Sequence, residues 1–244
     1  MDNDAHGQIH ELRQYTLHPG RRDELVEVFD NWFIEGQEDL GMVVQGQFSD
    51  LDRPDRFVWL RSFSDLEARR VALEGFYSGP VWAAHRDVAN ATMTAWDDVL
   101  LLQPISASDA GFAADRTLPP IGSTAVPAAM FAVDVHHFVE PLDEKALDFY
   151  LTRVEPALVE AGGERQALLV SHPGPNTYTK LPIRENEQVI VRVTRFDDVQ
   201  AGATHRERLS RSENWARIEA EWAPRLAGPS RHLRLRPTPR SRMR

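Results

Sequence analysis

The sequence predicts an α+β protein in which two ferredoxin-like βαββαβ modules stand in tandem. The first observation is an internal repeat, because three residues recur at one constant spacing along the chain. The matched residues are Phe63 with Phe196, Trp82 with Trp215, and Pro104 with Pro237. The second observation is that strand-like and helix-like stretches follow one another in the same order around both sets of matches. A third is the stretch between the copies, which is rich in Pro, Ala, Ser and Gly and lacks hydrophobic periodicity.

In the first copy, alternation of polar and apolar residues over 9–17 predicts a strand. Pro19 and Gly20 then predict a turn into a helix over 22–39. Two short strands, a long helix-compatible stretch and a last strand follow. These three strands are expected in the sequences MVVQGQF, FVWLRSF and VLLLQP.

The second copy repeats this order, with a first strand in MFAVDVHHFV and a helix over 143–161. Its later strands are expected in QALLVSH, VIVRVTRF and HLRLRP, and the longer insertion SHPGPNTYTKLPIRENE is expected to be a surface loop. The expected organisation is a first module over 8–104, a linker over 105–129, a second module over 130–237 and a disordered basic tail over 238–244.

Composition excludes several classes of function. The net charge of -9 argues against binding of nucleic acid, which is driven largely by Lys and Arg. The chain has no Cys, which excludes disulfides, iron-sulfur clusters and zinc bound by thiolates. No run approaches the roughly 18 apolar residues of a membrane span, and the first residues do not resemble a signal peptide. We therefore expect a cytoplasmic protein with no membrane partner.

The opening run IHELRQYTLHPGRRDELVEVF resembles the start of NIPSNAP-family domains. The residues that carry the resemblance are Glu11, Leu12, Arg13, Tyr15, Pro19 and Gly20, together with Trp82 and the strand VLLLQP. The likeness is good over 9–104 and weak over 131–237. It implies the dimeric α/β-barrel superfamily, in which two four-stranded sheets pack face to face. Here one chain would carry both sheets and pair them within itself, and a further homodimer of the chain is left open.

The resemblance implies a range of activities, because related barrels include cofactor-independent monooxygenases, haem-degrading enzymes, haem peroxidases and isomerases. The leading hypothesis is a small-molecule enzyme without a cofactor, which uses acid/base or cofactor-independent oxygenase chemistry on an apolar or aromatic substrate. One alternative is a haem-binding barrel. Another is a non-catalytic binding or scaffold module.

Three polar residues of the first strand share one face, since side chains two apart on a strand point the same way. They are Glu11, Arg13 and Tyr15. As a site, Arg13 would hold a substrate anion while Glu11 or Tyr15 moves a proton. As a structural feature, a Glu-Arg ion pair would fix the contact between the two sheets. Matching Tyr15 to Phe138 would set Glu11 against Asp134 and Arg13 against His136.

His85 is singled out by the repeat, because its counterpart in the second copy is Ile218. With Trp82 and Ala89 it lies on the helix face that is apolar in the second copy, so we expect it to point inward. There it would act as a general base, a proton shuttle or an axial haem ligand. The alternative is a core histidine with a hydrogen-bond partner.

His136 and His137 are adjacent on a strand and therefore face opposite sides. Asp134 and His136 share a face, as a carboxylate that orients an imidazole would, or as a structural hydrogen bond. No metal is expected, because no metal-ligand motif is present. Trp59, Trp82 and Phe63 would wall a substrate pocket, although such residues are also typical of a core.

Overall fold

The computed structural model describes residues 8–106, 109, 112 and 117–244. The first half contains β1 (Ile9–Leu17), α1 (Arg22–Val28), a π-helical turn (Phe29–Phe33), α2 (Ile34–Glu38), β2 (Val43–Asp50), β3 (Arg56–Phe63), α3 (Leu66–Ser78), α4 (Pro80–Thr92) and β4 (Met93–Pro104). The second half contains β5 (Met130–His137), α5 (Glu144–Phe149), a π-helical turn (Tyr150–Val154), α6 (Glu155–Glu160), β6 (Glu164–Ser171), β7 (Val189–Phe196), α7 (Val199–Arg211), α8 (Glu213–Trp222), a 3-10 turn (Ala223–Arg225) and β8 (Arg231–Pro237).

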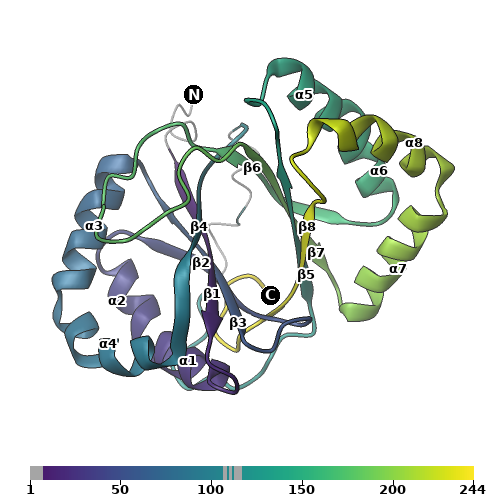
Figure 1. Ribbon diagram of the computed structural model, residues 1–244. Helices are drawn as coiled ribbons and strands as arrows, with labels where there is room; N and C mark the ends of the chain where they lie inside the picture. Colours follow the sequence, from purple (N-terminus) through teal and green to yellow (C-terminus); the bar gives the residue numbers. More distant parts are fainter. Residues whose placement is uncertain (1–7, 107–108, 110–111, 113–116) are drawn as a thin grey trace.

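The strands form one closed barrel in the order β1-β3-β2-β8-β5-β7-β6-β4. Each half contributes four adjacent strands, and the halves join through β2 with β8 and through β4 with β6. Closure leaves no unpaired sheet edge among the described strands. The helices lie outside the barrel, those of the first half on one side and those of the second half on the other (Figure 1). The predicted α+β class is confirmed, and in place of two separate sheets packed face to face the strands form one closed barrel.

The barrel interior is filled with apolar side chains rather than open. Alternation along β1 points Leu12 inward, where it joins a buried cluster with residues of the other strands. Members of this cluster include Phe48, Leu60, Leu100, Phe131, Val133, Val191 and Leu235. Two further apolar clusters lie between the outer barrel face and the helices, one in each half. The barrel interior therefore offers little room for a ligand.

Equivalent helices in the two halves begin with the same kind of N-cap, an aspartate side chain. Asp65 caps α3 by accepting a hydrogen bond from the backbone N–H of Ala68 at 2.7 Å. Asp198 caps α7 in the same way through Ala201, also at 2.7 Å. Gly79 separates α3 from α4, because it has an extended backbone and precedes Pro80, the first residue of α4. The single long helix predicted after Phe63 is therefore two helices.

The prediction of a disordered tail over 238–244 is wrong, because this segment packs against the first half of the protein. Met243 is 2% exposed and packs in the barrel cluster, and Arg240 is 1% exposed. Arg240 forms an ion pair with Glu35, and Arg242 pairs with Glu38. Glu35 and Glu38 of α2 thus hold the basic tail in place, although the tail has no hydrophobic periodicity.

Strand register corrects the match between the two first strands. Phe63 pairs with Ile9, whereas Phe196 pairs with Met130. Counting along each strand, Tyr15 therefore corresponds to His136 and not to Phe138. Within the described residues, no helix is long and apolar enough to cross a membrane.

Candidate functional site

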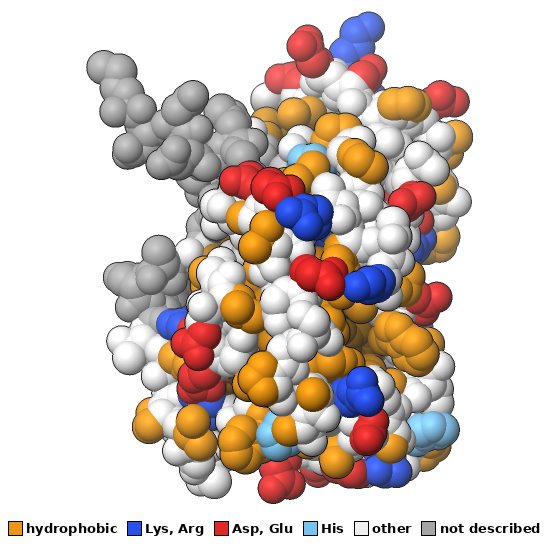
Figure 2. All heavy atoms as spheres, turned by 90° about the vertical axis from the view of Figure 1, so that its left-hand side faces the viewer, with side chains coloured by type: hydrophobic (Ala, Val, Ile, Leu, Met, Phe, Trp, Pro, Cys, Tyr) orange, Lys and Arg blue, Asp and Glu red, His pale blue; other side chains and the backbone are white. Residues whose placement is uncertain are grey.

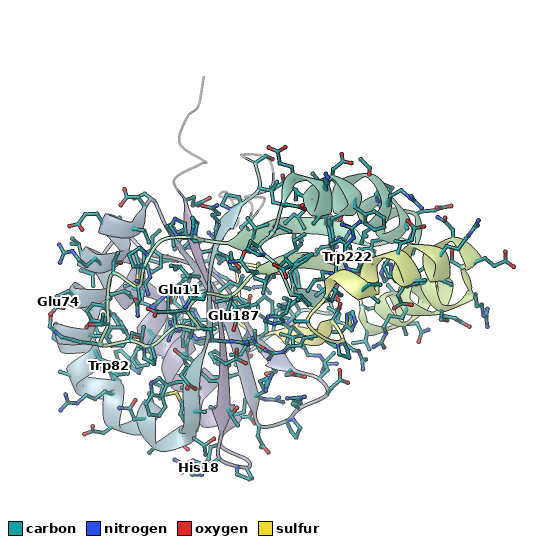
Figure 3. All side chains as sticks on the ribbon, turned by 45° about the horizontal axis from the view of Figure 1, so that its top comes forward. Glu11, His18, Glu74, Trp82, Glu187 and Trp222 are labelled. Carbon is teal, nitrogen blue, oxygen red and sulfur yellow. The ribbon has the colours of Figure 1, made fainter. Side chains whose placement is uncertain are left out.

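The polar face of β1 points outward from the barrel and is covered by the helices of the first half. Glu11 and Arg13 are fully buried, and Tyr15 is 7% exposed. The structural alternative placed a Glu-Arg ion pair between the two sheets. The position is wrong, because these side chains lie between the sheet of the first half and its helices. Figure 3 shows Glu11 on β1 in the same half as Glu74 and Trp82, with Trp222 in the other half.

Three arginines share the carboxylate of Glu11, and we call Arg13, Arg61 and Arg69 the arginine cluster. Their nitrogens lie 2.8 Å, 2.7 Å and 2.6 Å from its oxygens, and all four side chains are fully buried. Burial favours the neutral acid, but the charges of the arginine cluster hold the pKa of Glu11 well below its usual range. Glu11 is therefore ionised, and one negative charge faces three positive charges.

The arginine cluster also contacts α2 of the first half and a loop of the second half. Arg61 donates to the side-chain oxygen of Gln37 at 2.9 Å. Arg69 donates to Asn176 and to Thr177, each at 3.1 Å, and these residues belong to the loop between β6 and β7. Among the described residues, the Nη2 atoms of Arg13 and Arg69 have no hydrogen-bond partner. The cluster thus carries excess positive charge and unused donors.

Tyr15 connects the arginine cluster to open space. Its hydroxyl oxygen accepts a hydrogen bond of 2.9 Å from Nε of Arg13, so its own proton remains available to another acceptor. Burial raises the pKa of Tyr15 while Arg13 opposes that rise, and the phenol stays protonated at neutral pH. Tyr15 lines an internal cavity of about 30 Å³ and an adjoining surface pocket of about 450 Å³.

This surface pocket, called the first-half pocket below, has mainly aromatic walls. They are formed by Tyr15, Tyr77, Trp82, Trp96 and Tyr178. The rings of Tyr77 and Tyr178 stack at 6.0 Å, and Trp82 meets Tyr77 edge-on at 4.9 Å. Its rim carries the ion pair of Lys180 with Glu74 at 3.0 Å. On this side of the molecule hydrophobic side chains surround a hollow (Figure 2).

The other predicted wall residues divide between pocket and core. Trp82 lines both spaces and Trp59 lines the internal cavity. Phe63 lines neither and packs against the guanidinium of Arg61 at 5.4 Å. Sequence reasoning missed Arg61 and Arg69. The one charged residue inside the largely apolar run FVWLRSF was the available signal for Arg61.

His85 lies apart from the first-half pocket, which corrects its predicted inward orientation. Its ring stacks on Trp32 at 4.4 Å, at the edge of the contact between α4 and the π-helical turn. Trp32 is 51% exposed, so this is the periphery of the helical layer, whereas Ile218 is 1% exposed. His85 is among the lining residues of neither space at Tyr15. It therefore does not fit an axial ligand for a haem bound there.

In the second half, the predicted pair of Asp134 with His136 does not form. Asp134 bonds His232 instead, at 2.6 Å, and His136 bonds the hydroxyl of Ser230 at 2.7 Å. Asp134 and His232 stand directly opposite each other on β5 and β8. Side chains at such positions lie closer together than side chains two residues apart on one strand. His137 points to the other side of β5 and bonds Glu187. Among the described residues, no three His, Asp or Glu side chains are placed to hold a metal ion.

Comparison with known proteins finds a family model that matches the first half of the chain. The NIPSNAP family model matches residues 10–108, which span β1 to β4. None of the curated proteins matches the sequence.

Solved structures resemble the whole fold at low sequence identity. An anthrone oxidase-like protein is 15% identical, with a TM-score of 0.57 over 95% of this chain and 91% of its own. A candidate monooxygenase from Lactobacillus acidophilus NCFM is 12% identical, with a TM-score of 0.52 over 94% and 93%. A candidate chlorite dismutase is 13% identical, with a TM-score of 0.53 over 97% of each chain. The fold therefore resembles that of these three proteins, and residues 10–108 of this chain match the NIPSNAP family model.

Proposed function

We propose that this protein is a small-molecule enzyme that binds an apolar aromatic substrate in the first-half pocket and stabilises it as an enolate. The observation that carries this proposal is the arginine cluster, whose three buried guanidiniums share the single carboxylate of Glu11. A fold of this type hosts many activities, so the function is argued from the site.

Electrostatics favours an anion at the floor of the pocket. Charges act strongly on one another where water is excluded, and the cluster carries two more positive than negative charges among the described residues. Tyr15 lies between the cluster and the pocket, accepts from Arg13, and offers its own O–H to a substrate oxygen. A fixed donor backed by positive charge is the arrangement that stabilises a developing oxyanion.

The reaction class that fits is oxidation of an enolisable aromatic ketone by O2 without a cofactor. Lowering the pKa of the bound ketone lets its proton leave to water at the pocket mouth, and the enolate then reduces O2. For an anthrone-type ketone, one CH2 group and one O2 become one carbonyl group and one water. The anthrone oxidase-like structural neighbour supports this choice of substrate class.

We also propose that the two halves are tandem copies of one ferredoxin-like module. Support comes from the same βαββαβ order in both halves and from the equivalent helix caps Asp65 and Asp198. On this proposal the barrel closes within one chain, because β2 pairs with β8 and β4 with β6.

Oxygen uptake with anthrone tests the proposed function. We expect catalysed uptake of one O2 per anthrone and formation of anthraquinone, followed by absorbance. Tyr15→Phe should lower kcat by about 10²-fold, because it removes the donor to the oxyanion. His85→Ala, outside the pocket, serves as the matched control and should keep wild-type turnover.

Two results would contradict the proposal. Wild-type turnover in Tyr15→Phe would show that this hydroxyl does not act on the substrate. Tight binding of anthrone at Tyr15 without any turnover would make the chain a binding module, which is the non-catalytic alternative.

A further inference from the structure

The second half contains a pocket of about 350 Å³ between the outer face of its sheet and α7 and α8. It lies where the first-half pocket lies in the first half. Trp215 corresponds to Trp82 and His136 to Tyr15, and each of the four lines the pocket of its own half. We call it the histidine pocket, because its lining includes His136, His205 and His232.

The walls combine an apolar body with a few polar groups, as ligand pockets usually do. Apolar lining comes from Met130, Leu158, Phe196, Leu209, Trp215 and Leu233. The volume lies within the range of sites for small organic molecules, which begins at about 300 Å³. An extended aromatic or aliphatic body therefore matches the greater part of the wall.

Two buried imidazoles in the pocket have an unused nitrogen. His136 is 6% exposed and its Nε2 has no partner, while its Nδ1 bonds Ser230. His205 is 8% exposed and hydrogen-bonds the backbone of Ala161, which leaves Nδ1 without a partner. Burial lowers the pKa of His136 to about 4 and also lowers that of His205, so both rings are neutral at physiological pH. A buried polar atom without a partner is costly, and a ligand hydroxyl would satisfy it.

A third imidazole is held by a carboxylate. Asp134 Oδ1 lies 2.6 Å from Nδ1 of His232, which places the proton on Nδ1 and leaves Nε2 as an acceptor in the neutral ring. Asp134 raises the pKa of His232. Protonation of the His232 ring would remove this acceptor, so acceptor capacity at the ring depends on pH.

We propose that the histidine pocket binds a small uncharged aromatic molecule that carries a hydroxyl group. A hydroxyl both donates and accepts, which matches neutral imidazoles, and the aromatic body matches Trp215 and Phe196. While His232 is neutral, the charges of the lining balance, since Asp134 and Glu219 are matched by Arg206 and Arg234. The histidine pocket therefore lacks the excess positive charge of the arginine cluster. Its charges do not favour an anionic ligand over a neutral one.

Two probes of one size and different charge test this assignment, namely 2-naphthol and 2-naphthoate. Fluorescence titration should show 2-naphthol binding that Ala216→Trp weakens at least 10-fold, because Ala216 lines the histidine pocket on α8. Ala216 is exposed, so the larger side chain can be accommodated without unfolding. Ala83→Trp is the matched control, since Ala83 is the equivalent exposed position on α4 and lines neither space at Tyr15.

A second measurement examines the hydrogen bonds. Affinity for 2-naphthol should fall as pH falls through the pKa of His232, because protonation removes its acceptor. The charged and titratable groups that act on this ring are Asp134 and His136 from β5, Arg206 from α7 and Glu219 from α8. In His232→Gln, affinity for 2-naphthol should depend less on pH. In His136→Leu, binding of 2-naphthol should weaken at least 10-fold at every pH above the pKa of His136, which is about 4.

The outcomes separate this site from the first-half pocket. Loss of 2-naphthol binding in Ala216→Trp and in His136→Leu, but not in Ala83→Trp, would support it. Unchanged binding in Ala216→Trp would overturn it, as would equal affinity of the histidine pocket for 2-naphthoate. Neither result would bear on anthrone turnover at Tyr15.

Discussion

Arg69 of α3 and Glu11 of β1 meet at 2.6 Å with both side chains fully buried, which fastens the helical layer of the first half to its sheet. Arg69 reaches on to Asn176 and Thr177, so the same guanidinium holds the loop between β6 and β7. One buried residue thus connects the barrel, a covering helix and the loop that supplies Tyr178 to the pocket.

Replacing Glu11→Gln should destabilise the fold by about 3–5 kcal/mol, because three buried guanidiniums would lose their shared carboxylate. Urea unfolding measures this loss. Glu74→Gln is the matched control, since Glu74 is half exposed and its pair with Lys180 is worth about 0–1 kcal/mol. A loss below about 1 kcal/mol in Glu11→Gln would mean that the arginines find other partners.

Stability should fall in acid through Glu11. Its pKa is lower in the folded protein than in the unfolded chain, where a glutamate titrates near about 4.3. The stabilisation from ionised Glu11 is therefore fully present above the pKa of the unfolded chain and is lost as pH falls below that pKa toward the lower pKa of the folded protein. Urea midpoints between pH 3 and pH 6, values chosen to bracket about 4.3, should decline more steeply for wild type than for Glu11→Gln. Parallel curves would argue against an ionised Glu11.

Shortening Met243→Ala should cost about 2–4 kcal/mol, because this side chain is 2% exposed within the barrel cluster. Deleting residues 239–244 should cost more, since Arg240 and Arg242 would also leave Glu35 and Glu38. Thermal unfolding measures both changes. Removal of Arg244 alone, which is exposed, is the control and should have little effect. A deletion variant as stable as wild type would contradict the packed tail.

Exchange of Asn176→Ala should loosen the loop between β6 and β7. Its side chain accepts from Arg69 and donates to the backbone of Leu181 at 2.9 Å. Hydrogen exchange of amides in 172–188 should speed up, while amides of β7 should keep wild-type protection. Equal protection of the loop in both proteins would show that other contacts hold it.

A haemin titration should give no Soret band that depends on His85. The imidazole stacks on Trp32 and lies outside the lining of the spaces at Tyr15. Wild type and His85→Ala should therefore give the same absorption spectra across the titration. A saturable band lost only in His85→Ala would restore the axial role.

Local patterns in the sequence were sufficient for most elements and for the shared face of Glu11, Arg13 and Tyr15. Period-two alternation depends only on neighbouring residues, so β1 and β5 could be predicted. The arginine cluster could not, because Arg61 and Arg69 reach Glu11 from 50 and 58 positions away. The inward orientation predicted for His85 failed because the repeat carries no information about Trp32, which covers the ring from another element.

By itself the sequence determined the class of fold, the order of strands and helices, the absence of thiol chemistry and the resemblance to NIPSNAP domains over the first half. Only the tertiary structure decided which polar groups meet. It paired Asp134 with His232 rather than His136, and it ordered the basic tail against α2. The physical reason is that periodicity sets the face on which a side chain lies, whereas its partner is set by cross-strand register and by helices packed from distant parts of the chain.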